Sequence, residues 1–88
     1  MALTTGVTTV TTHGTRVVLA ATASANSGIV VKALSTNTGL IYVGTSSVSS
    51  VNGFQLGKSE AITIITGSPA TIYIDSAVDG EGVSWLLT

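Results

Sequence analysis

Apolar and polar residues alternate along most of this 88-residue chain. Alternation of this kind is typical of β-strands that bury one face. In the segment Ala70–Asp75, for example, two isoleucines alternate with Thr, Tyr and Asp. The β-branched residues Val, Ile and Thr dominate, and they pack well on a pleated sheet but lose side-chain freedom in a helix. The segment Arg16–Ala25 is the one rival for a helix, and its Val17-Val18 pair and lack of caps argue against it.

Seven strands are predicted from the alternation and the turn signals between them. They are Thr5–Thr12, Thr15–Ala21, Gly28–Ser35, Leu40–Val43, Ser59–Thr66, Ala70–Asp75 and Val83–Leu87. Turns are indicated at His13-Gly14, Asn37-Thr38-Gly39, Gly67-Ser68-Pro69 and Asp79-Gly80-Glu81-Gly82, and a loop at Thr22–Ser27. Thr45–Gly57 is predicted to be a long connection anchored by Val48, Val51, Phe54 and Leu56. Short strands with this spacing indicate a small β-sandwich or barrel of about six to seven antiparallel strands.

Two finer expectations concern strand pairing and the core. The strands on either side of the turn at residues 37–39 are expected to form a hairpin, Ile29–Leu34 against Leu40–Val43. Trp85 lies at the centre of the last strand, two residues from both Val83 and Leu87. Residues two apart on a strand share a face, so we expect Trp85 to lie in the core.

The length of the chain leaves room for one domain, residues 1–88, with a thin core of its own. Cysteine is absent, so no disulfide reinforces that core. The Thr-rich start buries few large side chains, and we expect residues 1–14 to form an N-terminal arm. Its β-branched composition suits the addition of a strand to a sheet edge, in the same chain or in a neighbour.

Charged residues make up only 8% of the chain, against about 25% in an ordinary soluble domain. Neutral hydroxyl and amide groups supply most of the polarity, and these can be buried at an interface at a lower cost than charges. We therefore expect a protein that binds other proteins, including itself as a homo-oligomer with a trimer favoured. The alternative is an ordinary Thr-rich β domain.

Charge and hydropathy also argue against other partners. The net charge is −1 and there is no basic run, which argues against nucleic-acid binding because phosphate contacts require Lys or Arg. No apolar stretch approaches the roughly 20 residues of a membrane-spanning helix. The first residues lack the pattern of a signal peptide, so synthesis in a cytoplasm is expected.

Candidate catalytic and metal-binding residues are few. His13 is the one histidine, and no serine lies in a nucleophile elbow, so we expect neither an enzyme nor a cofactor. Asp75, Asp79 and Glu81 form an acidic cluster that offers three carboxylates to Ca²⁺. Their spacing does not match an EF-hand loop, and Asp-Gly is a common hairpin signal. We therefore favour a solvated hairpin turn at Asp79-Gly80 without a metal.

Candidate interface residues come from the N-terminal segment and from the aromatic side chains, which contribute strongly to interfaces. They are Leu3, Val7, Val10, Tyr42, Phe54 and Tyr73.

A longer pattern of motifs runs through the second part of the chain. Its pieces are Val31–Gly44 with its Tyr-Val-Gly end, Val48, Asn52–Leu56, Glu60, Ile72–Asp75 and Gly82–Trp85. This order resembles small virion proteins of tailed bacteriophages, especially head-decoration (cement) proteins and minor capsid or fibre modules. The resemblance covers residues 28–88 and leaves out the Thr-rich start. It implies a β-sandwich that oligomerises on or within a virus particle and has no catalytic residues.

Together these observations lead to an expected function. The protein is expected to be a capsid-decoration protein on the surface of the virion, clamping neighbouring major-capsid subunits as a trimer at symmetry axes. The alternative is a carbohydrate- or receptor-binding module of a phage fibre, which would use Tyr42, Phe54 or Tyr73. Such a module would expose its aromatic side chains together on one face.

Overall fold

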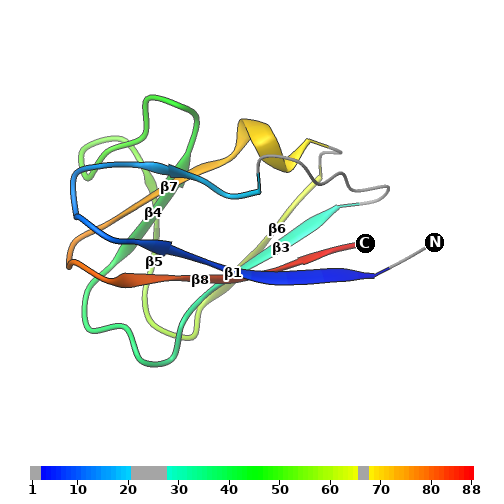
Figure 1. Cartoon of the computed structure of the whole chain (residues 1–88), viewed down its shortest axis with the longest axis horizontal. Helices are drawn as coiled ribbons and strands as arrows, with labels where there is room; N and C mark the ends of the chain where they lie inside the picture. The colour runs from blue at the N-terminus through cyan, green and yellow to red at the C-terminus, as the bar shows by residue number, and fades with distance from the viewer. Residues whose placement is uncertain (1–2, 21–27, 66–67) are drawn as a thin grey trace.

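The computed structural model describes residues 3–20, 28–65 and 68–88, which form two stacked antiparallel sheets (Figure 1). The first sheet has the order β1-β8-β3-β6 and the second β2-β7-β4-β5. The strands are β1 (Thr4–Val10), β2 (Val17–Val18), β3 (Ile29–Ala33), β4 (Ile41–Gly44), β5 (Phe54–Leu56), β6 (Ala61–Ile64), β7 (Tyr73–Ser76) and β8 (Glu81–Leu87), with one 3₁₀ turn, η1 (Pro69–Thr71). The prediction of an all-β sandwich is confirmed. The additional strand is β5, at the end of the segment predicted to be a loop.

The connections between strands define a jelly roll. Four antiparallel pairs, β4–β5, β3–β6, β2–β7 and β1–β8, are nested as if one long hairpin had been rolled up. Eight strands in two sheets with this nesting form the double-sheet jelly roll. Successive strands alternate between the sheets, except that β4 and β5 both lie in the second sheet.

The predicted hairpin of Ile29–Leu34 with Leu40–Val43 is therefore wrong. β3 pairs with β6 and β8 in the first sheet, whereas β4 pairs with β5 and β7 in the second. The linker between β3 and β4 is bound to the start of β8 instead. The Asn37 side chain donates to the Gly82 carbonyl at 2.9 Å, and the Leu34 N–H donates to the same oxygen at 3.1 Å. These bonds direct the chain across the end of the sandwich.

The turn at Asp79-Gly80 is present but does not close a hairpin. Gly80 has φ = +79°, a conformation that glycine adopts without steric cost. The turn connects β7 in the second sheet to β8 in the first. The turn at His13-Gly14 likewise leads from the first sheet to the second. Both predicted turns are therefore present. Turn residues do not specify, however, whether the strand that follows pairs with the strand that precedes it.

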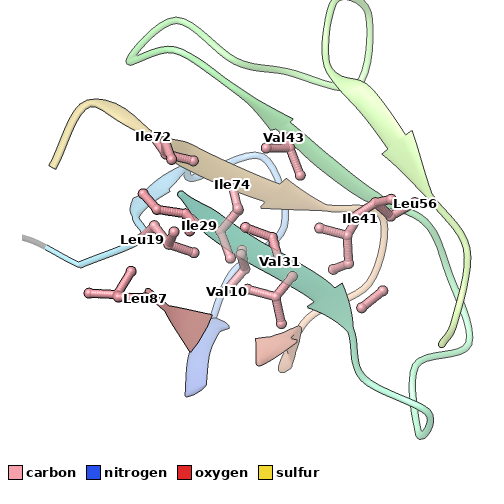
Figure 2. Packing of buried hydrophobic residues seen from close by; sticks show 12 residues of the cluster. Val10, Leu19, Ile29, Val31, Ile41, Val43, Leu56, Ile72, Ile74 and Leu87 are labelled. Atoms are coloured by element: carbon pink, nitrogen blue, oxygen red, sulfur yellow. The ribbon is translucent and has the colours of Figure 1, made fainter. Parts of the chain in front are cut away.

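The hydrophobic core lies between the two sheets. Figure 2 shows Ile29 and Val31 of β3 facing Val43 and Ile74 of the second sheet. The core consists of Val10, Leu19, Ile29, Val31, Ala33, Ile41, Val43, Leu56, Ile72, Ile74, Val83 and Leu87. Both β1 and β8 contribute to it, so the first and last strands of the chain are needed to complete it.

The N-terminal segment is an integral strand rather than an arm. β1 pairs with β8 in continuous register from Thr4 opposite Leu87 to Val10 opposite Glu81 (Figure 1, dark blue beside red). Val10 is fully buried in the core. The Thr8 hydroxyl lies at the centre of a short chain of hydrogen bonds: it accepts one from Trp85 Nε1 at 2.9 Å and donates one to the Leu19 carbonyl at 2.6 Å. These contacts fix β1 to β8 and to the segment that follows β2.

Trp85 packs against the core but is only partly buried. It lies opposite Gly6 on β1, and a Cβ atom at Gly6 would lie 2.3 Å from Trp85 Cζ2. The indole ring therefore occupies the space that any other residue at position 6 would fill. The expectation that Trp85 shares a face with Val83 and Leu87 is correct, although its burial is incomplete.

Candidate functional site

The acidic residues near the last turn each bind a different part of the backbone. Asp75 Oδ1 accepts hydrogen bonds from the N–H groups of Gly14 at 2.9 Å and Ser76 at 2.8 Å, and Asp79 Oδ1 accepts one from the His13 N–H at 2.8 Å. Asp75 and Glu81 are buried, so the expectation of a solvated acidic turn is wrong for these two residues. Within residues 3–20, 28–65 and 68–88, no group of three or more His, Cys, Asp or Glu side chains converges on a common point.

Glu81 holds the linker between β3 and β4. Its carboxylate accepts the N–H groups of Thr38 at 2.5 Å and Gly39 at 2.9 Å, and the Thr38 hydroxyl at 2.8 Å. The Thr38 N–H, assisted by the other two donors and opposed by desolvation, holds the pKa of Glu81 below its usual value. Hydrogen bonds to the charged form of a carboxyl group have this effect.

The lowered pKa of Glu81 predicts a loss of stability in acid. The stabilisation is complete above the unfolded pKa of about 4.3 and is lost as the pH falls through the lower folded value. We expect a Glu81→Gln variant to be less stable than the parent at pH 7, with a difference that shrinks toward pH 3. Urea titrations at several pH values would measure this. Equal stability differences at pH 7 and pH 3 would contradict the role of the carboxylate.

The six candidate interface residues separate into buried and exposed groups. Val10 is 0% exposed and Tyr42 is 7% exposed, so these two side chains belong to the interior of the domain. Leu3, Val7 and Phe54 are 66%, 63% and 58% exposed, and Tyr73 is partly buried.

Tyr42 is buried because the loop between β4 and β5 covers it. A Cβ atom at Gly53 would lie 2.4 Å from Tyr42 Cβ and 3.0 Å from Val48 Cγ2, so the loop backbone rests directly on the tyrosine. Val48 is buried and anchors this loop as predicted, and Leu56 is buried on β5. Val51 and Phe54 are exposed, so the prediction that they anchor the loop is wrong.

The exposed face of the first sheet brings Leu3 and Val7 together with residues from three other strands. Strand register places Val7, Ser84, Lys32 and Ala61 in one cross-strand row and Thr5, Leu86, Val30 and Thr63 in the next. Ile65 lies beside this face, with its Cδ1 atom 3.6 Å from a Cβ position on Gly28. We call this surface, formed by the outward residues of β1, β8, β3 and β6 with Leu3 and Ile65, the outer face.

Lys32 is the one charged residue in these two rows. A shallow depression of about 390 Å³ lies at their centre. It is lined by Thr5, Gly6, Val7, Val30, Lys32, Ser84, Trp85 and Leu86. Ser84 is small and lies between Val7 and Lys32, so the sheet is hollowed there. Lys32 is exposed, and a lysine can keep its ammonium group in water while its aliphatic stem lines an apolar surface. The depression can therefore accept an apolar side chain of another molecule.

Val30, Leu86 and Ile65 were not predicted to be surface residues. A signal was present, because apolar residues occupy consecutive positions in Ile29-Val30-Val31 and in Trp85-Leu86-Leu87. Side chains on a strand alternate between faces, so such runs indicate that both faces are apolar.

Comparisons with known protein families, with curated proteins and with solved structures found no match to this chain. In the described part of the chain, no helix has the length and apolar character needed to cross a membrane. Within the described residues, the candidate site is an exposed sheet face of a small jelly roll whose two central rows contain one charged residue, Lys32.

Proposed function

We propose that this protein is a virion structural protein, a capsid-decoration protein that binds the assembled phage head through its outer face. The observation that supports this most is the exposure of Leu3, Val7 and Ile65 around a face whose two central rows hold a single charge. Exposed apolar surface on a small soluble domain marks a site of contact with another molecule. Depletion of charge at the centre of the patch is characteristic of protein interfaces.

The mechanism would be stabilisation by mass action. A protein that binds the assembled shell, and not its separated subunits, raises the free energy needed for disassembly. The jelly roll is compatible with this role, since it occurs in viral capsid domains as well as in lectins. That compatibility is an analogy at the level of the fold. The order of the motifs in residues 28–88 suggests the phage head as the partner, and the outer face supplies the surface for binding it. No catalytic step is part of the proposed function.

The aromatic side chains favour this proposal over a glycan-binding fibre module. Tyr42 is covered by the loop between β4 and β5, and Tyr73 is partly buried on β7. Phe54 is exposed on β5, at the opposite edge of the second sheet from β2. These three rings do not form one exposed face on which a sugar ring could stack.

Binding to phage heads tests the proposal. Heads of the phage that encodes the protein, prepared without it, are mixed with the parent and with a Leu86→Lys variant and then sedimented. We expect the parent to co-sediment and the variant to bind at least about tenfold more weakly, because a charge would enter the centre of the interface. Val51→Lys is the matched control, since Val51 is 93% exposed on a loop away from the outer face. Failure of the parent to bind, or equal binding by Leu86→Lys, would contradict the proposal.

A further inference from the structure

The free edge of β1 differs from the other sheet edges. Among the strands that the structure describes, β1 pairs with β8 alone, so its other side carries backbone N–H and C=O groups without a strand partner. Natural edge strands are usually protected by shortness, charge, proline or a bulge. The other three edges are short: two residues in β2, three in β5 and four in β6.

β1 has none of these protective features. It is seven residues long, with the sequence Thr-Thr-Gly-Val-Thr-Thr-Val, and contains neither a charge nor a proline. Its register with β8 is continuous over all seven residues, so no bulge twists the edge away. An unprotected strand of this length is suited to pairing with another strand.

The sequence of β1 is complementary to itself in the antiparallel direction. Two copies of β1 can be paired antiparallel about a twofold axis that lies between their Val7 residues. Val7 then faces Val7 of the second copy, and Thr5 faces Thr9 of that copy. On the other side of the strand, Gly6 faces Thr8 of the second copy. Threonine pairs and β-branched pairs are favourable across antiparallel strands, and no like charges meet. A twofold axis brings the same patch of each copy together, which a self-complementary strand requires.

We infer that β1 pairs with β1 of a second copy of this chain and that the assembly unit is a dimer. The two first sheets then join into one continuous sheet of eight strands, and the two outer faces become one surface. This departs from the trimer expected from composition, because β1 can pair with itself only about a twofold axis. The inference does not depend on the proposed binding to phage heads.

Opposite charges at Val7 provide the test. Val7 is 63% exposed in the single chain, so Val7→Lys and Val7→Glu are expected to fold with melting temperatures close to the parent. In the dimer, two like charges would lie directly opposite each other. We expect the dimer dissociation constant of each variant to rise at least about fivefold. An equimolar mixture of the two variants should recover dimers, because Lys then faces Glu.

Light scattering over a range of concentrations measures the mass, with Val51→Lys as a control that keeps the parent's dimer. Hydrogen exchange of residues 4–10 should also slow as the parent's concentration rises. A parent that is monomeric or trimeric would overturn the inference, and so would dimerisation that Val7→Lys does not weaken. Failure of the mixture to recover dimers would equally overturn it. None of these assays contains phage heads, so their outcome is separate from that of the binding experiment.

Discussion

Removal of residues 2–12 is expected to abolish cooperative folding of the domain. The deletion removes all of β1, with its seven-residue register to β8, and the fully buried Val10. It also exposes the inner side of Trp85 and leaves the Leu19 carbonyl without the Thr8 hydroxyl. Loss of one fully buried apolar side chain costs about 2 kcal/mol or more, and an entire strand of a small domain contributes several times this. The free energy lost with β1 therefore approaches the whole free energy of unfolding of a domain of this size.

Circular dichroism and thermal melting would measure this loss. We expect the truncated chain to lack a sharp melting transition, whereas deletion of residues 2–3 alone, which leaves β1 intact, should preserve one. The same truncation also separates the two interpretations of this segment. An N-terminal arm, as the sequence suggested, could be removed without unfolding. A truncated chain that melts as sharply as the parent would restore that interpretation.

The sequence suggested an arm because the inward residues of β1 are small. Thr4, Gly6 and Thr8 contribute little apolar volume. The Trp85 ring from β8 fills the space at Gly6 and donates a hydrogen bond to Thr8. The pairing of β1 with β8 joins the two ends of the chain. Local periodicity carries no information about such a distant partner, because alternation identifies which face is buried and not what covers it.

Because periodicity is local, strand positions could be predicted from the sequence but strand partners could not. β3, β4, β7 and β8 were located to within a few residues, since each has clear alternation and flanking turn signals. Their pairing was not predictable. A hairpin and a crossing to the other sheet require similar turn residues, and here the crossing is held by bonds of Asn37 and Glu81 to parts of the backbone that are distant in sequence.

The candidate site was predicted in part for a related reason. Leu3 and Val7 stood out as apolar residues in a polar strand, and both are exposed on the outer face. Tyr42 was selected because aromatic residues are common at interfaces. It is covered by a loop in which Gly53 packs against Tyr42 and Val48, and the local sequence does not predict this tertiary contact. Val30 and Leu86 were not singled out, and each lies between two residues that are buried in the core or packed against it.

Replacement of Trp85 by alanine is expected to cost about 3 kcal/mol, the lower end of the range for truncation of a large aromatic residue, because the ring is only partly buried. The loss has two components. The ring fills the space opposite Gly6, which β1 cannot fill itself, and its Nε1–H binds the Thr8 hydroxyl at 2.9 Å. Urea unfolding of the parent and the variant would give the difference in free energy.

A Trp85→Phe variant separates these two components. Phenylalanine keeps most of the ring over Gly6 but has no N–H group, so Thr8 retains its bond to the Leu19 carbonyl and loses its bond to Trp85. We expect this variant to lose about 1 kcal/mol, the usual net value of one hydrogen bond. If Trp85→Ala cost no more than Trp85→Phe, packing of the ring against Gly6 would contribute nothing. The structure would then give no reason for a glycine at position 6, since the Trp85 ring is what excludes a side chain there.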